Sequence, residues 1–319
     1  MPVEKIARKH VREFREALQE LPVRRAGKLQ RATLPELVEW SKKHPGARRV
    51  SAATVNKLLG GVQAVAVWAR DNGLIPDDVP WADPFSNMRL DEAEPARAPW
   101  EAAELRVLFA SPVFAEGARP KAARGEAAFW LPLLALFTGA RLSELAPLSA
   151  ADVQTDELTN IHLIAITEDL EQGRRLKTPG SRRVVPVHPE LIRIGFIEFV
   201  QRVRQEHGGE ARLFPLLTLG PRGGYGEAWS KWFGRYIRQL GISNKALVFH
   251  SFRHGFKDAL RTAGVGEDVN DALTGHAGAG SVGRTYGAKE MLKRFGLPVL
   301  NDAVSKVRYP GLDLSHLRS

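Results

Sequence analysis

Three amphipathic segments near the start of the chain predict a small helical bundle. The first segment repeats apolar residues at helical spacing, at Val11, Phe14 and Leu18. The second begins with Thr33 and Glu36, which have the spacing of an N-terminal capping box. The third begins after Ser51 and ends near Asn72. Its apolar positions are Val55, Leu58, Leu59, Val62, Val65 and Ala69.

An acidic, proline-rich stretch follows this bundle. The prolines exclude a long helix there, and they are Pro76, Pro80, Pro84, Pro95 and Pro99. Residues 71–104 contain 9 acidic residues against Arg89 and Arg97, whereas residues 5–49 contain 13 Lys or Arg against 5 Glu. Two charge regimes indicate two modules. We therefore expect a domain boundary near residues 91–99, with domains at 1–95 and 96–319.

The second module has a mixed pattern that predicts helices around a small antiparallel sheet. Helical patterning covers Leu105, Leu108 and Phe109, an apolar segment covers residues 129–137, and helical patterning returns in residues 191–203 and 229–240. Strand-like segments lie at residues 161–167, 174–178 and 182–187, with a Pro-Gly-Ser turn before the last of them. The sequence therefore predicts a mainly α fold with a small antiparallel β-sheet.

Composition narrows the classes of function. The 319 residues carry 46 Lys or Arg against 36 Asp or Glu, a net charge of +10. This charge only slightly favours a protein that binds a polyanion, such as nucleic acid, over a basic enzyme that does not. Without cysteine, the chain has no disulfide, thiolate metal site or thiol nucleophile. The apolar run at 129–137 is too short to cross a bilayer, and residues 1–15 lack a secretory signal. We expect a soluble cytoplasmic protein that does not bind membranes.

One predicted helix gathers cationic side chains beside an apolar face. In residues 249–260, His250, Arg253 and Lys257 share a face at helical spacing, next to an apolar face that anchors the helix. His254 lies off this stripe, where it packs or supports the other side chains. A basic amphipathic helix facing solvent explains the same pattern.

Three other positions, distant in sequence, carry candidate chemistry. Arg141 stands at the predicted start of a short helix, where Glu144 can brace its guanidinium, although a surface ion pair is the simpler interpretation. His276 follows Gly275 in a loop, and Tyr286 lies ten residues later. A turn histidine and a half-buried aromatic are their ordinary explanations. Together with His250 and Arg253, these groups can hold a phosphodiester among cationic donors and attack it with a phenol, which makes DNA strand transfer the leading hypothesis.

The order of these residues resembles the tyrosine recombinases of the phage integrase family. The pattern consists of Arg141, Lys177 in a hairpin, His250-x-x-Arg253, Gly275-His276 and Tyr286. It spans residues 100–286, and the basic bundle before it is similar to that family's core-binding domain. The resemblance implies an N-terminal helical core-binding bundle followed by an α+β tyrosine-recombinase catalytic domain. We expect no separate N-terminal arm-binding domain, because the chain starts at the core-binding region.

The chemistry assigns a role to each candidate. Arg141 and Arg253 form a guanidinium clamp, while His250 and His276 are further donors, and His250 accepts the proton of Tyr286. The resemblance makes Lys177 the donor of a proton to the leaving 5′ oxygen. Phosphate contacts are expected from the remaining cations of the hairpin and from the basic bundle. They are Arg174, Arg175, Arg182, Arg183, Arg24, Arg25, Lys28, Lys42, Lys43, Arg48 and Arg49.

By the same resemblance, Tyr286 forms a 3′-phosphotyrosyl link without a cofactor or metal. Double-stranded DNA is the expected partner, with a homotetramer in the synaptic complex and a monomer as the expected free state. An apolar tail follows Tyr286 and is expected to dock on a neighbouring subunit, through Met291, Leu292, Phe295, Leu297, Val299 and Leu300. Alternatives are a type IB topoisomerase, a catalytically silent DNA-binding protein of the same fold, and a metal-dependent nuclease, for which convincing acidic ligands are lacking.

Overall fold

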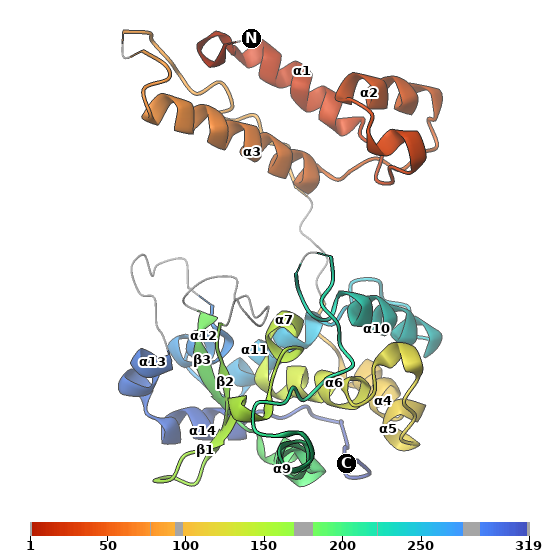
Figure 1. Cartoon of the computed structure of the whole chain (residues 1–319), viewed down its shortest axis with the longest axis vertical. Helices are drawn as coiled ribbons and strands as arrows, with labels where there is room; N and C mark the ends of the chain where they lie inside the picture. The colour runs from red at the N-terminus through yellow and green to blue at the C-terminus, as the bar shows by residue number, and fades with distance from the viewer. Residues whose placement is uncertain are drawn as a thin grey trace. The chain divides into compact units, whose positions relative to one another are not determined.

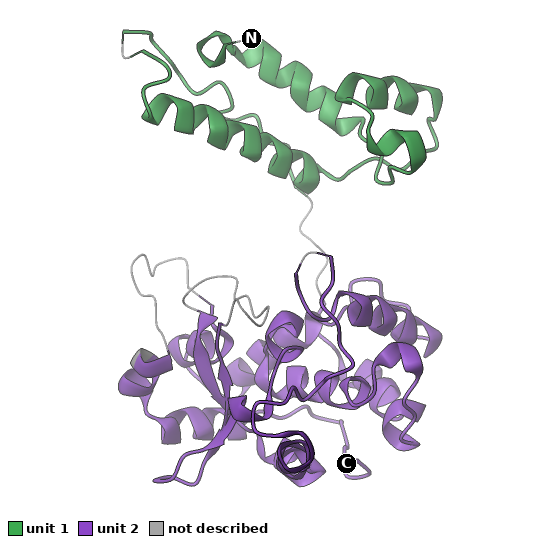
Figure 2. Cartoon of the chain, in the orientation of Figure 1, with its two compact units in different colours: residues 1–95 green, residues 96–319 purple. Residues whose placement is uncertain are grey.

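The chain divides into two compact units, residues 1–95 and 96–319 (Figure 2). The computed structural model describes residues 2–76, 78–92, 98–168, 181–221, 223–276 and 288–317. The functions expected of the two units remain predictions. Within the described ranges, every helix is too short or too polar to cross a lipid bilayer.

The first unit contains three α-helices, α1 (Arg8–Gln19), α2 (Leu34–Lys43) and α3 (Ala52–Asp71) (Figure 1). Thr33 and Glu36 form the capping box that their spacing predicts, since the Thr33 amide donates to Glu36 Oε2 at 2.7 Å. The Ser51 hydroxyl accepts a hydrogen bond from the Thr54 amide at the start of α3. The core of this unit consists of Val11, Leu18, Leu21, Leu37, Val55, Leu59, Ala66, Phe85 and Met88.

Residues 72–92, which follow α3, form no helix where the structure describes them, but they contribute to this core. Phe85 and Met88 are 5% exposed. Buried Asn56 on α3 fixes the stretch, because its amide donates to Leu90 O and its carbonyl accepts from Leu90 N, both at 2.8 Å. The stretch therefore packs back on its own bundle.

The apolar stripe expected on α3 is only partly buried. Val55 and Leu59 are buried, but Leu58, Val62 and Val65 are 40%, 39% and 63% exposed. At 100° per residue Leu58 and Val65 lie to one side of the buried positions, whereas Val62 lies between buried Val55 and Ala69. The apolar stripe therefore extends beyond the face that the rest of the unit covers.

The second unit is built around one fully buried helix. All 12 residues of α6 (Ala127–Thr138) are buried, and α11 (Ser251–Thr262) packs along it. The other α-helices surround this pair (Figure 1). They are α4 (Ala102–Phe109), α5 (Pro112–Ala115), α7 (Leu142–Leu145), α8 (Pro189–Ile194), α9 (Phe196–His207), α10 (Glu227–Gln239), α12 (Glu267–Thr274), α13 (Ala288–Phe295) and α14 (Leu297–Ser305).

The expected antiparallel sheet is confirmed, with a strand order of β1-β2-β3. The strands are β1 (Val153–Thr155), β2 (His162–Ile166) and β3 (Arg183–Pro186). Ile164 on β2 pairs with Val153 on one side and Val185 on the other. The sequence did not predict β1, and the strand expected at 174–178 lies outside the described residues. Helices α12, α13 and α14 pack against β3.

The end of the chain packs on its own unit. Met291 and Leu300 are 1% and 0% exposed, whereas Val299 is 51% exposed. Residues 306–317, here called the C-terminal segment, return to early helices. Tyr309 Oη donates to Leu136 O at 2.6 Å, and Arg106 donates to Gly311 O at 3.0 Å. Docking of the apolar tail on a neighbouring subunit stays a prediction.

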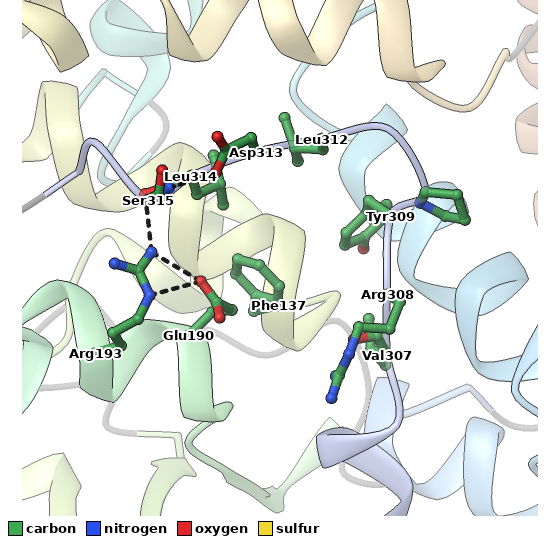
Figure 3. A pocket seen from close by; sticks show the side chains of 11 residues that line it. Phe137, Glu190, Arg193, Val307, Arg308, Tyr309, Leu312, Asp313, Leu314 and Ser315 are labelled. Carbon is green, nitrogen blue, oxygen red and sulfur yellow. Dashed lines mark hydrogen bonds and ion pairs between the residues drawn. The ribbon is translucent and has the colours of Figure 1, made fainter.

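A cavity of about 360 Å³ lies between α8 and the C-terminal segment (Figure 3). Arg193 lines it and donates to Glu190 Oε2 and to Leu314 O, both at 2.8 Å. None of the catalytic or DNA-binding residues predicted from the sequence lines this cavity. It is a gap beside the C-terminal segment and plays no part in the site described next.

Candidate active site

Arg141 is placed by a tight turn at the end of α6. Gly139 has a φ of 62°, a left-handed conformation that ends the helix and sends the chain into α7. A Cβ atom at this glycine would lie 2.5 Å from Cδ1 of Phe256 on α11, so only glycine fits this close approach. Arg141 therefore stands at the N-terminus of α7, close to α11.

Glu144 holds Arg141 as the sequence predicts. Its Oε1 lies 2.6 Å from Arg141 Nη1, and its Oε2 accepts the Arg141 backbone amide at 2.8 Å. The same Oε2 accepts a hydrogen bond from Nη2 of Arg183 at 2.8 Å. Burial alone would raise the pKa of Glu144, but the charge and hydrogen bond of Arg183 and the contacts from Arg141 hold that pKa at about 2. The carboxylate is therefore ionised and bridges two guanidinium groups.

The predicted phosphate contact by Arg183 is corrected by the structure. Its side chain is 1% exposed, because besides Glu144 it bonds Leu273 O at 2.7 Å and Ser181 O at 3.0 Å. A Cβ atom at Gly275 would lie 3.0 Å from Arg183 Nη1, so the turn after α12 rests directly on this guanidinium. Arg183 thus links α7 to the turn that carries His276.

Arg253 lies on α11, where it reaches the turn before Arg141. Its Nη1 donates to Gly139 O at 2.9 Å, and the residue is 5% exposed. Its Nη2 is buried and makes no hydrogen bond to the residues that the structure describes. Burial, together with the charges of Arg141 and Arg183, lowers the pKa of Arg253 to about 9. A buried, incompletely bonded guanidinium beside two other cations is an arrangement that an anion would stabilise strongly.

His250 and His254 precede and follow Arg253 in the sequence at the start of α11. His250 caps the N-terminus of the helix, one turn before Arg253, and is half-buried. Its ring centroid lies 5.2 Å from that of His254, with the two rings nearly perpendicular. His254 therefore packs against His250, as one of the two roles expected for it.

His276 follows α12, which ends at Gly275 with a φ of 62°. Its backbone amide donates to Asp271 O at 3.0 Å, and its Nδ1 lies 3.6 Å from Asp271 Oδ1. Burial and the charge of Lys257, followed by those of Arg253 and Arg141, lower the pKa of His276, although Asp271 opposes them. Arg141, Arg253 and His276 therefore share one electrostatic environment.

Besides the Arg183–Glu144 pair, a second ion pair at this site is not predicted by the sequence pattern. Lys257 Nζ lies 3.0 Å from Asp271 Oδ1. The sequence places Lys257 on the same helical face as His250 and Arg253, which indicates that Lys257 lies near the site. Asp271 gave none, since a single acidic residue on α12 is typical of a solvated helix surface.

Several predicted site residues lie outside the described residues. They are Lys177, Tyr286, Arg174 and Arg175. Arg182 is described, and its exposed side chain lies 3.1 Å from Glu168 Oε2.

In the first unit, most of the predicted phosphate contacts are exposed. They are Arg24, Arg25, Lys28, Lys42, Lys43 and Arg48. Lys42 forms an ion pair with Glu39 at 2.8 Å. Arg49 is different, because it bonds Glu20 Oε2 at 2.7 Å and also donates to the carbonyls of Ser41, Pro45 and Ala47. These contacts fix its guanidinium on this unit, and its role as a phosphate contact stays a prediction.

Residues 114–292 match the model of the phage integrase family. A search of curated protein sequences gave no significant match.

Solved structures with a similar fold include the integrase of the Tn1549 transposon in two complexes. With transposon right end DNA, it is 18% identical, the match covers 92% of this chain and 87% of that one, and the TM-score is 0.54. With circular intermediate DNA, it is 19% identical, the match covers 92% of this chain and 82% of that one, and the TM-score is 0.53. The integrase from mycobacterium phage Brujita is 17% identical, with coverages of 98% and 90% and a TM-score of 0.42. The expected mainly α architecture with a tyrosine-recombinase catalytic domain is confirmed by the family match and the Tn1549 structures.

Proposed function

Because the chain belongs to the phage integrase family, we propose that it is a site-specific DNA recombinase that cleaves and rejoins strands through a 3′-phosphotyrosyl intermediate. In the cleavage step, Tyr286 Oη forms a bond to the scissile phosphorus while the bond from phosphorus to the 5′ oxygen breaks. The reverse attack by a 5′ hydroxyl rejoins the strands, so the energy of the phosphodiester is retained.

The observation that carries this proposal is the buried Nη2 of Arg253, which lacks a hydrogen bond within the described part of the chain. A phosphodiester under attack gains negative charge on its non-bridging oxygens, and fixed cationic donors stabilise that charge. Arg253 is fixed by Gly139 O, and Arg141 by Glu144. The two guanidinium groups therefore need little reorganisation to clamp a phosphate.

The remaining groups move the protons. A phenol has a pKa near ~10 and is a weak nucleophile at neutral pH, so it needs a base. His250 accepts the proton of Tyr286, and Lys177 gives a proton to the leaving 5′ oxygen. His276 donates a hydrogen bond to the phosphate.

Double-stranded DNA is the proposed partner, with four copies of the chain in the synaptic complex and the cytoplasm as the compartment. The structures of the Tn1549 integrase are complexes with DNA. Exposed cations on the first unit supply complementary charge. Binding should therefore weaken steeply with salt, because each contacted phosphate releases counterions. A flat response to salt would contradict the role of the basic unit as a DNA clamp.

The decisive experiment uses a nicked suicide duplex and denaturing gels. Wild-type protein should form a covalent adduct, whereas Tyr286→Phe should bind the duplex normally and form none. Tyr225→Phe is the matched control, since the Tyr225 ring packs under Arg212 and is not assigned a role in the reaction. An adduct at full strength in Tyr286→Phe would refute the assignment. Exchange of strands between two marked duplexes then separates a recombinase from a relaxing enzyme.

A further inference from the structure

A lysine and a histidine converge on one carboxylate oxygen beside the guanidinium cluster. Asp271 Oδ1 lies 3.0 Å from Lys257 Nζ and 3.6 Å from His276 Nδ1. The Lys257 and Asp271 side chains are 14% and 25% exposed, whereas the His276 side chain is 55% exposed. The ion pair therefore lies deeper than the imidazole that it contacts.

The surrounding structure fixes this carboxylate. Helices α11 and α12 pack together, and Asn270 Nδ2 on α12 donates to Lys257 O at 3.0 Å. The His276 amide donates to the carbonyl of Asp271 itself. The backbone of Asp271 thus fixes the main chain of His276, and its carboxylate lies beside the imidazole.

We propose that Asp271 and Lys257 are positioning residues for His276, which hold its Nδ1 and set the pH at which the imidazole changes charge. This inference rests on the proposed function of His276 as a phosphate donor. The negative carboxylate beside Nδ1 favours a proton on that nitrogen, so Nε2 is the nitrogen left for DNA. A neutral imidazole held this way has a lone pair on Nε2, whereas the charged form donates from both nitrogens. The charge state therefore decides whether His276 can donate to the phosphate.

The charges around His276 oppose one another. Lys257 and Arg253 on α11, with Arg141 before α7, disfavour the charged imidazole, whereas Asp271 favours it. Glu267, at the start of α12, also interacts with the charge of His276, which contributes to lowering the pKa of Glu267 after the larger effect of Arg261. Lys257 and Asp271 have opposite effects on one titrating group, although they form a single ion pair. If the two residues only stabilised the helices, removing either one would not move the pKa of His276 in opposite directions.

The test compares two variants by NMR of histidine labelled at Cε1 in the full chain, with the His276 signal assigned by its loss in His276→Gln. Asp271→Asn removes the favourable charge and leaves Lys257 unpaired, so the pKa of His276 should fall. Lys257→Gln removes an unfavourable charge, so the pKa should rise. Each change is expected to be about half a unit or more, typical of a charge within a few ångströms. The pH profile of adduct formation should shift in the same two directions.

Controls separate this effect from damage to the helices. Asp268→Asn makes the same charge change on α12, where its partner is Arg294, and should leave the pKa of His276 unchanged. Asp271→Glu and Lys257→Arg keep the charges and should restore the wild-type titration. Shifts in the same direction, or none, in the two test variants would overturn the inference. The titration is read without DNA, so it can fail while Tyr286 still forms an adduct, and it can succeed in a chain that forms none.

Discussion

Arg183 and Glu144 form an ion pair in which each side chain is 1% exposed, with Arg183 Nη2 2.8 Å from Glu144 Oε2. The pair joins β3 to α7, and Arg183 also bonds the carbonyl of Leu273 at the end of α12. Arg141 and the turn that precedes His276 thus rest on an ion pair that is almost completely buried.

Replacing Arg183 by Met should destabilise the second unit by about 3–5 kcal/mol, because the Glu144 charge would stay buried with one partner fewer. Chemical denaturation measures this change. Arg182→Met is the control, since Arg182 is the next residue but its side chain is 53% exposed. It should alter the free energy of unfolding by no more than about 0.5 kcal/mol. Equal changes in the free energy of unfolding for the two substitutions would mean that the buried ion pair does not stabilise the second unit.

Replacing Arg253 by Lys should slow single-turnover adduct formation by about 10²–10³-fold, the usual effect of losing one oxyanion donor. One ammonium group cannot reproduce the planar fork that bonds Gly139 O through Nη1 and leaves Nη2 for the phosphate. Arg261→Lys, on the exposed side of the same helix, serves as the control. A wild-type rate in Arg253→Lys would remove Arg253 from the clamp.

Gly139→Ala should lower the stability of the second unit by at least about 2 kcal/mol, combining left-handed strain with overpacking. The added methyl group would meet the Phe256 ring at 2.5 Å. Gly234→Ala, in the middle of α10, meets no atom within 4 Å and should raise stability by up to about 1 kcal/mol. Thermal melts of the two variants test the contrast, which a loss of stability in both would contradict.

Stability should fall on acidification because of His188. Burial lowers the pKa of this histidine to about 4 from an ordinary value of 6.5, while its Nε2 donates to Val307 O. The unfolded chain therefore binds more protons between pH 6.5 and pH 4, and the folded state loses about 3 kcal/mol across that window.

Urea unfolding at a series of pH values measures this loss. His188→Gln should flatten the dependence in that window, although it lowers stability at pH 7. His207→Gln, at an exposed histidine, should leave the dependence intact. An unchanged pH dependence in His188→Gln would show that another group causes the loss.

Local chemistry explains which parts of the fold could be predicted. Thr33 and Glu36 satisfy each other within one turn, so their spacing alone specifies the start of α2. Gly139 and Arg141 likewise mark a helix end and the next helix start. By contrast, helical periodicity shows that Leu58 and Val55 lie near one another on α3, but it cannot show how far the covering side chains extend.

The roles of Arg183 and Asp271 depend on partners far away in the sequence. Arg183 bonds Glu144, 39 residues earlier, and Leu273, 90 residues later. Nothing in the segment around β3 distinguishes this arginine from the exposed Arg182 beside it. Charge and hairpin position therefore suggested DNA contact for both, and only the tertiary structure separates them.

Residues 306–317 tie the folding of the second unit to contacts that are distant in sequence. His316 contacts Phe109 O and Arg106 contacts Gly311 O, which are separations of 207 and 205 residues. Contacts this distant must wait for a large loop to close, which slows folding. On the ribosome, α4 and α6 emerge long before residues 306–317, so their apolar surfaces stay incompletely covered until synthesis of this segment ends.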